Sequence, residues 1–201
     1  MTSDASLAAL AGAAYSAAPT WQSGDVHACL TETPDGTVLA FRGTVPDSIS
    51  DWVRDFDAVP AWRPHLGFCH RGFLDGALAV WPQIQGAIHG RRIILTGHSL
   101  GGALALVTAG LMAGEGASPA LVVTFGAPRA AAATMASLLS PVAMRQYHNG
   151  NDPVPDVPAW FRHMRPLIQL GVDEPDPIDA HSIALYSANV ATYEASCAAA
   201  G

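Results

Sequence analysis

The chain of 201 residues is 50% hydrophobic and only 13% charged, and it carries a formal net charge of −7. This length suits one domain with one core. The acidity and the lack of a basic cluster argue against a nucleic-acid-binding surface. No run reaches the roughly 18 uninterrupted apolar residues of a membrane span. Metal-ligand spacings such as Cys-x-x-Cys do not occur, so we expect neither a metal nor a cofactor.

The amino terminus and the cysteines bear on the cellular compartment. Residues 1–7 lack the positive charge that opens a secretory signal. We therefore predict a cytoplasmic protein, or a secreted one if a leader has been removed. Cys29, Cys69 and Cys197 are odd in number and show no paired spacing. At least one is therefore unpaired, and we expect reduced, mostly buried thiols.

The first part of the chain predicts a helix followed by a β-hairpin. Apolar residues recur at helical spacing over Ser6–Tyr15. Residues 25–31 alternate between apolar and polar, the turn signal Thr33-Pro-Asp-Gly36 follows, and residues 37–41 are apolar again. This order is typical of a hairpin, so the sheet is expected to begin antiparallel.

Residues 49–56 carry apolar side chains at positions i, i+3, i+4 and i+7, namely Ile49, Trp52, Val53 and Phe56. A helix of about two turns is too short to be stable alone. The pattern fits either an ordinary surface helix or a mobile lid over a pocket. Residues 60–64 contain two prolines and are expected to be irregular.

From residue 66 onward, short apolar runs alternate with helical patterns. Pro82 predicts a kink or a break in the first of these helices. Strand, helix and strand in succession imply parallel crossover connections, and hence an α/β fold with a mostly parallel sheet and helices on both faces. The expected strands are residues 66–70, 93–95, 120–125, 142–147 and 162–170, and the expected helices are residues 73–88, 103–109, 130–139 and 180–199.

The motif Gly97-His-Ser99-Leu-Gly101 lies between a predicted strand and a predicted helix. In that context it indicates a nucleophile on a sharp turn, because the two glycines let strand and helix approach each other. The N–H of Leu100 would lie in the first turn of the helix, at the positive end of its dipole, ready for an oxyanion. The alternative is a glycine-rich turn with an uninvolved serine.

A serine nucleophile needs a base beside it and an acid that orients the base. In α/β-hydrolases the order is Ser, acid, His, and only His148, His163 and His181 follow Ser99. His181 lies at a predicted loop-to-helix junction, whereas His163 falls within a predicted strand. Asp152 follows a predicted strand and opens a proline-rich turn. We therefore predict Ser99, Asp152 and His181 as the catalytic set.

Other residues compete for these roles. Asp152 could instead cap a turn, and His181 could be a surface residue in the first turn of the closing helix. The rival acids are Asp156, Asp176 and Asp179. His70 and His98 are expected to be hydrogen-bonded structural histidines beside the site, and His27, His65 and His89 carry no signal.

Six motifs, in order, resemble the class 3 lipases, the family typified by filamentous-fungal triacylglycerol lipases. They are Phe41-Arg-Gly-Thr44, Ile49-Ser-Asp-Trp-Val-Arg-Asp55, His70-Arg-Gly-Phe-Leu74, Gly97-His-Ser-Leu-Gly-Gly102, Gly126-Ala-Pro-Arg129 and Asn151-Asp-Pro-Val-Pro155. The resemblance covers about residues 8–186 and places Ser99, Asp152 and His181 at the triad positions. It implies that Thr44 joins Leu100 in the oxyanion hole and that residues 49–56 take the position of the lid. The expected organisation is one α/β-hydrolase domain over residues 1–201, with a lid at about 45–64.

The resemblance implies a serine carboxylic ester hydrolase that acts on acylglycerols or related lipid esters through an acyl-enzyme. A short-chain carboxylesterase, a phospholipase A1, a feruloyl esterase and a lipid-binding protein without turnover stay open. The expected partner is a lipid or small ester, with transient binding to a lipid interface if a lid opens. No nucleic acid and no protein partner is implied. The chain departs from the fungal enzymes in the longer segment between Thr44 and Ile49 and in the lack of their disulfide framework.

Overall fold

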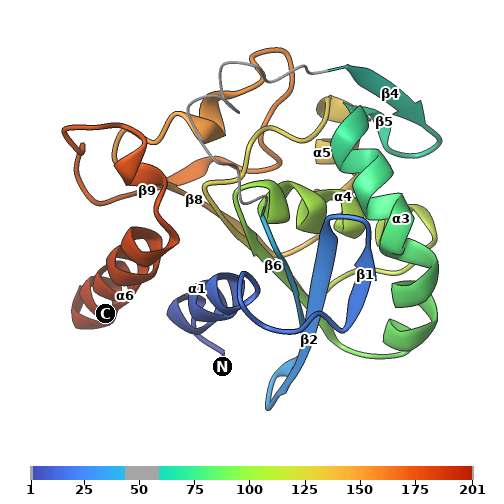
Figure 1. Ribbon diagram of the computed structural model, residues 1–201, viewed down its shortest axis with the longest axis horizontal. Coiled ribbons are helices and arrows are strands. Elements are labelled where there is room, and N and C mark those ends of the chain that lie inside the picture. The colour runs from blue at the N-terminus through green and yellow to red at the C-terminus, as the bar shows by residue number, and fades with distance from the viewer. Residues whose placement is uncertain (1, 44–58, 201) are drawn as a thin grey trace.

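The computed structural model describes residues 2–43 and 59–200. Figure 1 shows a central sheet with helices on both faces. The strands are β1 (Trp21–Ser23), β2 (Val26–Thr33), β3 (Gly36–Phe41), β4 (Pro60–Arg63), β5 (Gly67–His70), β6 (Ile93–His98), β7 (Leu121–Phe125), β8 (Met144–Asn149) and β9 (Leu167–Leu170). The helices are α1 (Asp4–Ala13), α3 (Arg71–Ile88), α4 (Leu100–Gly114), α5 (Ala133–Leu138) and α6 (Ile183–Ala200), with 3-10 turns η1 (Val154–Asp156) and η2 (Asp179–His181).

Within the described residues, the main sheet has seven strands in the order β1-β2-β3-β6-β7-β8-β9. β1, β2 and β3 are antiparallel neighbours, whereas the neighbours β3, β6, β7, β8 and β9 run parallel. β4 and β5 form a separate two-stranded antiparallel sheet. The predicted antiparallel start and parallel continuation are therefore confirmed. Because the carboxyl ends of parallel strands meet at one edge, the loops after β6, β7 and β8 converge there.

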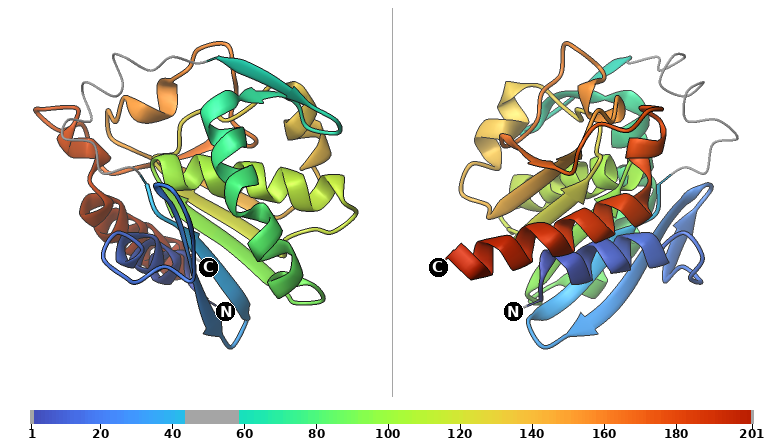
Figure 2. Two further views of the ribbon diagram at one scale, coloured as in Figure 1. Left: turned by 45° about the vertical axis from the view of Figure 1, so that its right-hand side comes forward. Right: turned by 90° about the vertical axis from the view of Figure 1, so that its left-hand side faces the viewer.

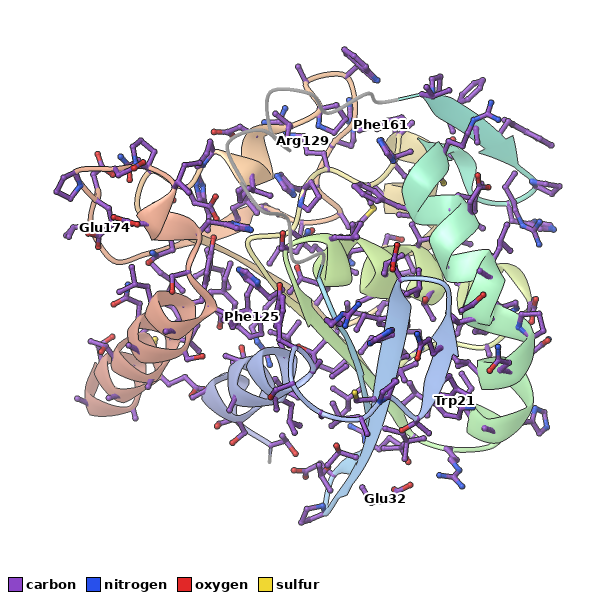
Figure 3. The ribbon with its side chains drawn as sticks, viewed as in Figure 1. Trp21, Glu32, Phe125, Arg129, Phe161 and Glu174 are labelled. Carbon is purple, nitrogen blue, oxygen red and sulfur yellow. The ribbon has the colours of Figure 1, made fainter. Side chains whose placement is uncertain are left out.

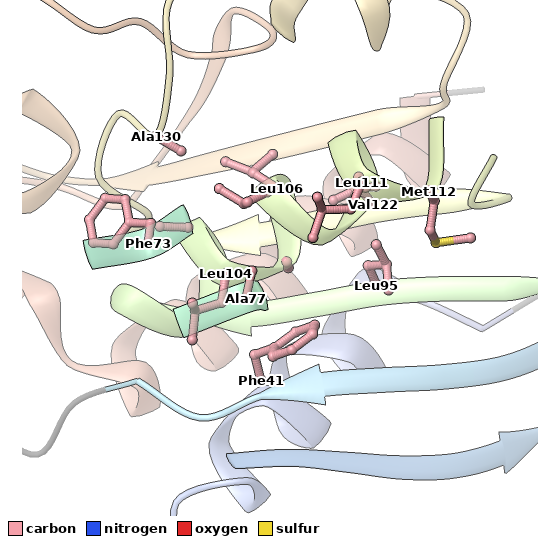
Figure 4. Packing of buried hydrophobic residues seen from close by; sticks show 14 of the residues in the cluster. Phe41, Phe73, Ala77, Leu95, Leu104, Leu106, Leu111, Met112, Val122 and Ala130 are labelled. Atoms are coloured by element: carbon pink, nitrogen blue, oxygen red, sulfur yellow. The ribbon is translucent and has the colours of Figure 1, made fainter. Parts of the chain in front are cut away.

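Alternate residues of the central strands face two separate hydrophobic clusters. Val38 and Ile94 pack with α1 and α6, whereas Leu39 and Leu95 pack with α3 and α4. A strand that is buried on both faces has a nearly continuous run of apolar residues, and this run is what predicts β6 from the sequence. Figure 2 shows α1 and α6 side by side on one face of the sheet. Figure 4 shows the packing of the opposite cluster, where Leu104 of α4 lies among the buried side chains.

Several local predictions are wrong. Residues 60–63 are not irregular but form β4, which pairs with β5 so that Trp62 lies opposite Phe68. Pro60 is tolerated because it opens an edge strand. Of the two outcomes predicted at Pro82, a kink or a break, the break does not occur: α3 continues to Ile88, and residues 80, 81 and 84 around Pro82 are buried. The short strand β1 was not anticipated.

The three cysteines are free thiols. Cys69 is buried and Cys29 is partly buried, but Cys197 is exposed, contrary to the mostly buried set that we expected. Burial raises the pKa of the Cys69 thiol to about 11. Among the helices that the structure describes, none is long and apolar enough to cross a membrane.

Candidate active site

Ser99 lies on a strained turn between β6 and α4. Its backbone torsions, φ 57° and ψ −131°, are sparsely available to a residue with a side chain. A Cβ on Gly97 would collide with the backbone of Gly101, and a Cβ on Gly101 would collide with the carbonyl of Phe41. Strand and helix therefore meet this closely only because both positions are glycine. This is the geometry of a nucleophile elbow.

The first turn of α4 offers a donor beside this serine. Leu100 opens the helix, and N–H groups of a first turn have no acceptor within their own helix. The helix dipole adds positive charge at the same place, which would stabilise an oxyanion. Thr44, the expected second donor, lies outside the described residues, as do the expected lid residues Ile49, Trp52, Val53 and Phe56.

Asp152 and His181 form a fully buried pair. Nδ1 of His181 lies 2.7 Å from Oδ2 of Asp152, and both side chains are 0% exposed. The other carboxylate oxygen, Oδ1, accepts the N–H of Val154 at 2.9 Å, so the turn after β8 fixes the acid. Because an ionised carboxylate only accepts, Nδ1 carries the proton and Nε2 keeps its lone pair. His181 lies in η2, just before α6, and not in the first turn of that helix as expected.

His98 supports His181 from β6. Its Nε2 donates to the carbonyl of His181 at 2.8 Å, so its Nδ1 must accept from the hydroxyl of Tyr15, also at 2.8 Å. The two imidazole rings lie 4.6 Å apart between centroids. Burial and the neighbouring His181 hold the pKa of His98 well below its usual value, which keeps His98 neutral. These contacts agree with the structural role expected for this histidine.

Ser99 and His181 both approach the end of β7. The N–H of Ser99 donates to the carbonyl of Phe125 at 3.0 Å, and a Cβ on Gly126 would lie 3.0 Å from Cε1 of His181. Phe125, labelled in Figure 3, lies on the side of the sheet that α1 covers. Within the described residues, Nε2 of His181 has no hydrogen-bond partner, so the Ser99 hydroxyl is not bonded to it in this structure. A buried acceptor without a partner is costly and is common at functional sites.

The rival acids lie apart from this pair. Asp156 is exposed and forms an ion pair with Arg129 at 3.4 Å. Asp176 accepts the N–H of Ile178, and Asp179 opens η2 as an exposed residue. Across residues 2–43 and 59–200, none of these three carboxylates pairs with a histidine.

The rival histidines make other bonds. Nε2 of His163 bonds the carbonyl of Pro155 at 2.8 Å, and Nε2 of His148 bonds the carbonyl of Asp152 at 2.9 Å. His163 lies in an irregular segment and not within a strand as predicted, because β9 spans only residues 167–170. The predicted strand at His163 is therefore wrong.

Tyr186 contacts the candidate site, although the sequence does not predict this contact. Its hydroxyl lies 2.7 Å from Oδ2 of Asp152, although the two residues are 34 positions apart. In the sequence Tyr186 is one aromatic residue of the closing helix, and no local pattern predicts that its hydroxyl bonds Asp152.

A mostly parallel sheet with an antiparallel start, a serine on the turn after β6 and a buried acid–histidine pair after β8 define an α/β-hydrolase fold. The chain belongs to the class 3 lipase family, since the family model described as lipase (class 3) matches residues 38–162.

Similar proteins are longer than this chain. A secreted mono- and diacylglycerol lipase of Fusarium solani is 29% identical over 143 residues, which cover 64% of this chain and 42% of that protein. The structure of the Rhizomucor miehei lipase with its propeptide is similar with a TM-score of 0.64 at 27% identity, covering 75% of this chain and 55% of that one. A triacylglycerol lipase whose catalytic centre is described as a serine protease triad gives a TM-score of 0.61 at 25% identity, covering 76% and 64%. The chain spans less than half the length of the curated relatives that it matches.

Proposed function

We propose that this chain is a serine ester hydrolase of the lipase type that acts on acylglycerols or related lipid esters. The observation that carries the proposal is the buried Asp152–His181 pair, with an unbonded Nε2, beside a serine on a strained turn. Membership in the class 3 lipases supports ester hydrolysis. The triad described for a similar triacylglycerol lipase supports the roles given to these three residues.

In the proposed reaction, Nε2 of His181 takes the proton of Ser99 while Oγ attacks the ester carbonyl carbon. Asp152 holds the imidazole in the required tautomer and stabilises its cation. The tetrahedral intermediate breaks its ester C–O bond, and the alcohol leaves with the proton from Nε2. Water then attacks the acyl-enzyme and gives a proton to Nε2, and that proton returns to Oγ as the carboxylic acid leaves.

This mechanism requires the Ser99 hydroxyl to come within hydrogen-bond reach of Nε2. Such bonds are often long or unformed in free enzymes and tighten only with substrate. The proposed oxyanion donors are the N–H of Leu100 and Thr44, and loss of one such donor typically costs about 3–4 kcal/mol of transition-state stabilisation.

The substrate class and the lid are part of the proposal. Residues 49–56 are proposed to form the lid, within a single domain; its carboxyl-terminal limit must precede Pro60, because residues 60–63 form β4. A panel of esters, triacylglycerols and phospholipids, assayed with and without an interface, separates a lipase from a short-chain esterase or a phospholipase A1. The similar Fusarium and Penicillium proteins are named as secreted lipases, which favours secretion over the cytoplasmic location expected from residues 1–7.

The test is covalent labelling by a fluorophosphonate together with hydrolysis of a soluble 4-nitrophenyl ester. We expect Ser99→Ala to abolish labelling and to lower kcat by about 10⁴-fold or more while circular dichroism stays native. Ser140→Ala removes an exposed hydroxyl elsewhere and should behave as the wild type. Activity near wild type in Ser99→Ala would overturn the proposal, and lipid binding without labelling would favour a catalytically silent protein.

A further inference from the structure

One oxygen of the buried acid accepts two hydrogen bonds. Oδ2 of Asp152 lies 2.7 Å from Nδ1 of His181 and 2.7 Å from the hydroxyl of Tyr186. The carboxylate is 0% exposed, so these two donors, with the N–H of Val154 on Oδ1, take the place of water around its charge. Tyr186 and His181 therefore share the charge of the same oxygen.

The direction of the Tyr186 hydroxyl follows from its second contact. The backbone N–H of Asn149 donates to this hydroxyl at 3.0 Å. Because an N–H can only donate, the phenol oxygen is the acceptor there, and its own hydrogen is left for Asp152. Burial, followed by the charge of Asp152, raises the pKa of Tyr186 well above its usual value, so the phenol keeps this hydrogen.

The fold makes a specific space for this contact. Tyr186 is fully buried, and its ring packs edge-on against His98 and Phe125. A Cβ on Gly126 would lie 3.0 Å from the Tyr186 ring, from Oδ2 of Asp152 and from Cε1 of His181. The three groups meet at one point because position 126 has no side chain.

We propose that Tyr186 is a positioning residue that fixes Asp152 and lowers the basicity of the Asp152–His181 pair by competing with His181 for Oδ2. This inference rests on the proposed function, because it concerns the base of the same reaction. Among the residues that the structure describes, the other titratable groups facing the pair are His98 from β6 and His148, whose Nε2 bonds the carbonyl of Asp152. Neither of them bonds Oδ2, so among these described groups Tyr186 is the one that competes with His181 for this oxygen.

The test is the pH dependence of kcat/KM for a soluble ester in Tyr186→Phe. Without the phenol, the full charge of Oδ2 acts on the imidazolium and favours the protonated base. The acid limb of the profile should therefore move upward by about half a pH unit. Without the hydrogen bond from Tyr186, the carboxylate of Asp152 is held less firmly, and kcat should fall roughly ten-fold with little change in KM. A residue that only fills space would lower stability and leave the position of the limb unchanged.

Tyr147→Phe is the matched control, because Tyr147 also donates to a buried carboxylate, that of Asp4, at 2.6 Å. Its acid limb should coincide with that of the wild type. If Tyr186→Phe does not fold, site-specific replacement of Tyr186 by 3,5-difluorotyrosine keeps the ring and makes the phenol a stronger donor. The limb should then move downward.

The inference would be overturned if the acid limb of the kcat/KM profile did not move in either Tyr186 variant. It would also be overturned if Tyr147→Phe shifted the limb by the same amount as Tyr186→Phe. The proposed function is judged separately by Ser99→Ala. If that variant is inactive and the Tyr186 profiles are unmoved, only the role of Tyr186 fails, whereas an active Ser99→Ala removes the basis of both proposals.

Discussion

Position 126 limits how closely the side chains of the candidate site can meet. Gly126 directly follows β7 and has a φ of +58°, a conformation that L side chains rarely adopt. An added Cβ would also lie 3.0 Å from Asp152, His181 and Tyr186. The backbone torsion and the crowded surroundings are two separate reasons for a glycine here, and a control can separate them.

We expect Gly126→Ala to lower kcat by up to about 100-fold, because small displacements of catalytic groups cost that much. Gly24→Ala is the control, since Gly24 has a φ of +56° but nothing within 4 Å of its ideal Cβ. The control should lose roughly 1 kcal/mol of unfolding free energy through strain and keep its kcat. Urea unfolding and ester hydrolysis measure both quantities. Equal kcat values for the two variants would show that the contacts around position 126 do not matter.

Residues of the candidate site can be predicted from the sequence only where a local pattern marks them. Ser99 stands in a motif, and Asp152 and His181 follow it in the chain order expected for the fold. Tyr186 and the crowding at Gly126 depend on contacts between segments far apart in sequence, and no local pattern encodes such contacts.

Helices α1 and α6 together hold His181 in place. Glu194 of α6 accepts the N–H of Asp4 at 2.6 Å and that of Ala5 at 3.2 Å, so it caps the amino terminus of α1. Just beyond the other end of α1, Tyr15 donates to His98, which in turn bonds the carbonyl of His181. His181, the proposed base, thus lies directly before the start of α6 and is linked through His98 to the end of α1.

Glu194→Gln should lower the free energy of unfolding by about 1 kcal/mol, because the amide loses one acceptor and the charge that favours a helix amino terminus. Glu174→Gln is the control, since it removes the same charge from a residue that uses only its backbone in the bonds to Asn151. Urea denaturation of both variants measures the difference. The capping role would be contradicted if the two variants were equally stable.

Among helices and strands, the sequence predicts those that carry a clear apolar pattern within their own residues. These are the hairpin of β2 and β3 and the strand–helix units around β6 and β7. It missed β1 and β4 because three- or four-residue strands carry too little pattern, and each is defined by its partner strand. Pro82 does not break α3, since buried residues on both sides of it keep the helix continuous. Local propensity yields to tertiary packing in each of these cases.

Across the whole molecule, three of the four tyrosines each hydrogen-bond a buried titratable side chain. Tyr15 bonds His98, Tyr147 bonds Asp4 and Tyr186 bonds Asp152. Burial is the main cause that raises the pKa of all three phenols above the ordinary value. These bonds join α1 and α6 to the sheet and to the loop after β8, so the ionisation of the three phenols and the integrity of the fold are linked.

The sign of this linkage predicts the behaviour in alkali. A phenol whose pKa is higher in the folded state than in the unfolded chain, where it is about 10, stabilises the fold fully below that pH and less as the pH rises above it. We therefore expect the unfolding free energy to fall above about pH 10. Absorbance at 295 nm should first report Tyr193, which is 37% exposed, and the other three phenols should ionise together with the loss of the circular dichroism signal. Gradual ionisation of all four in a chain that keeps its native dichroism would contradict the linkage, because the buried phenols would then be titrating without unfolding.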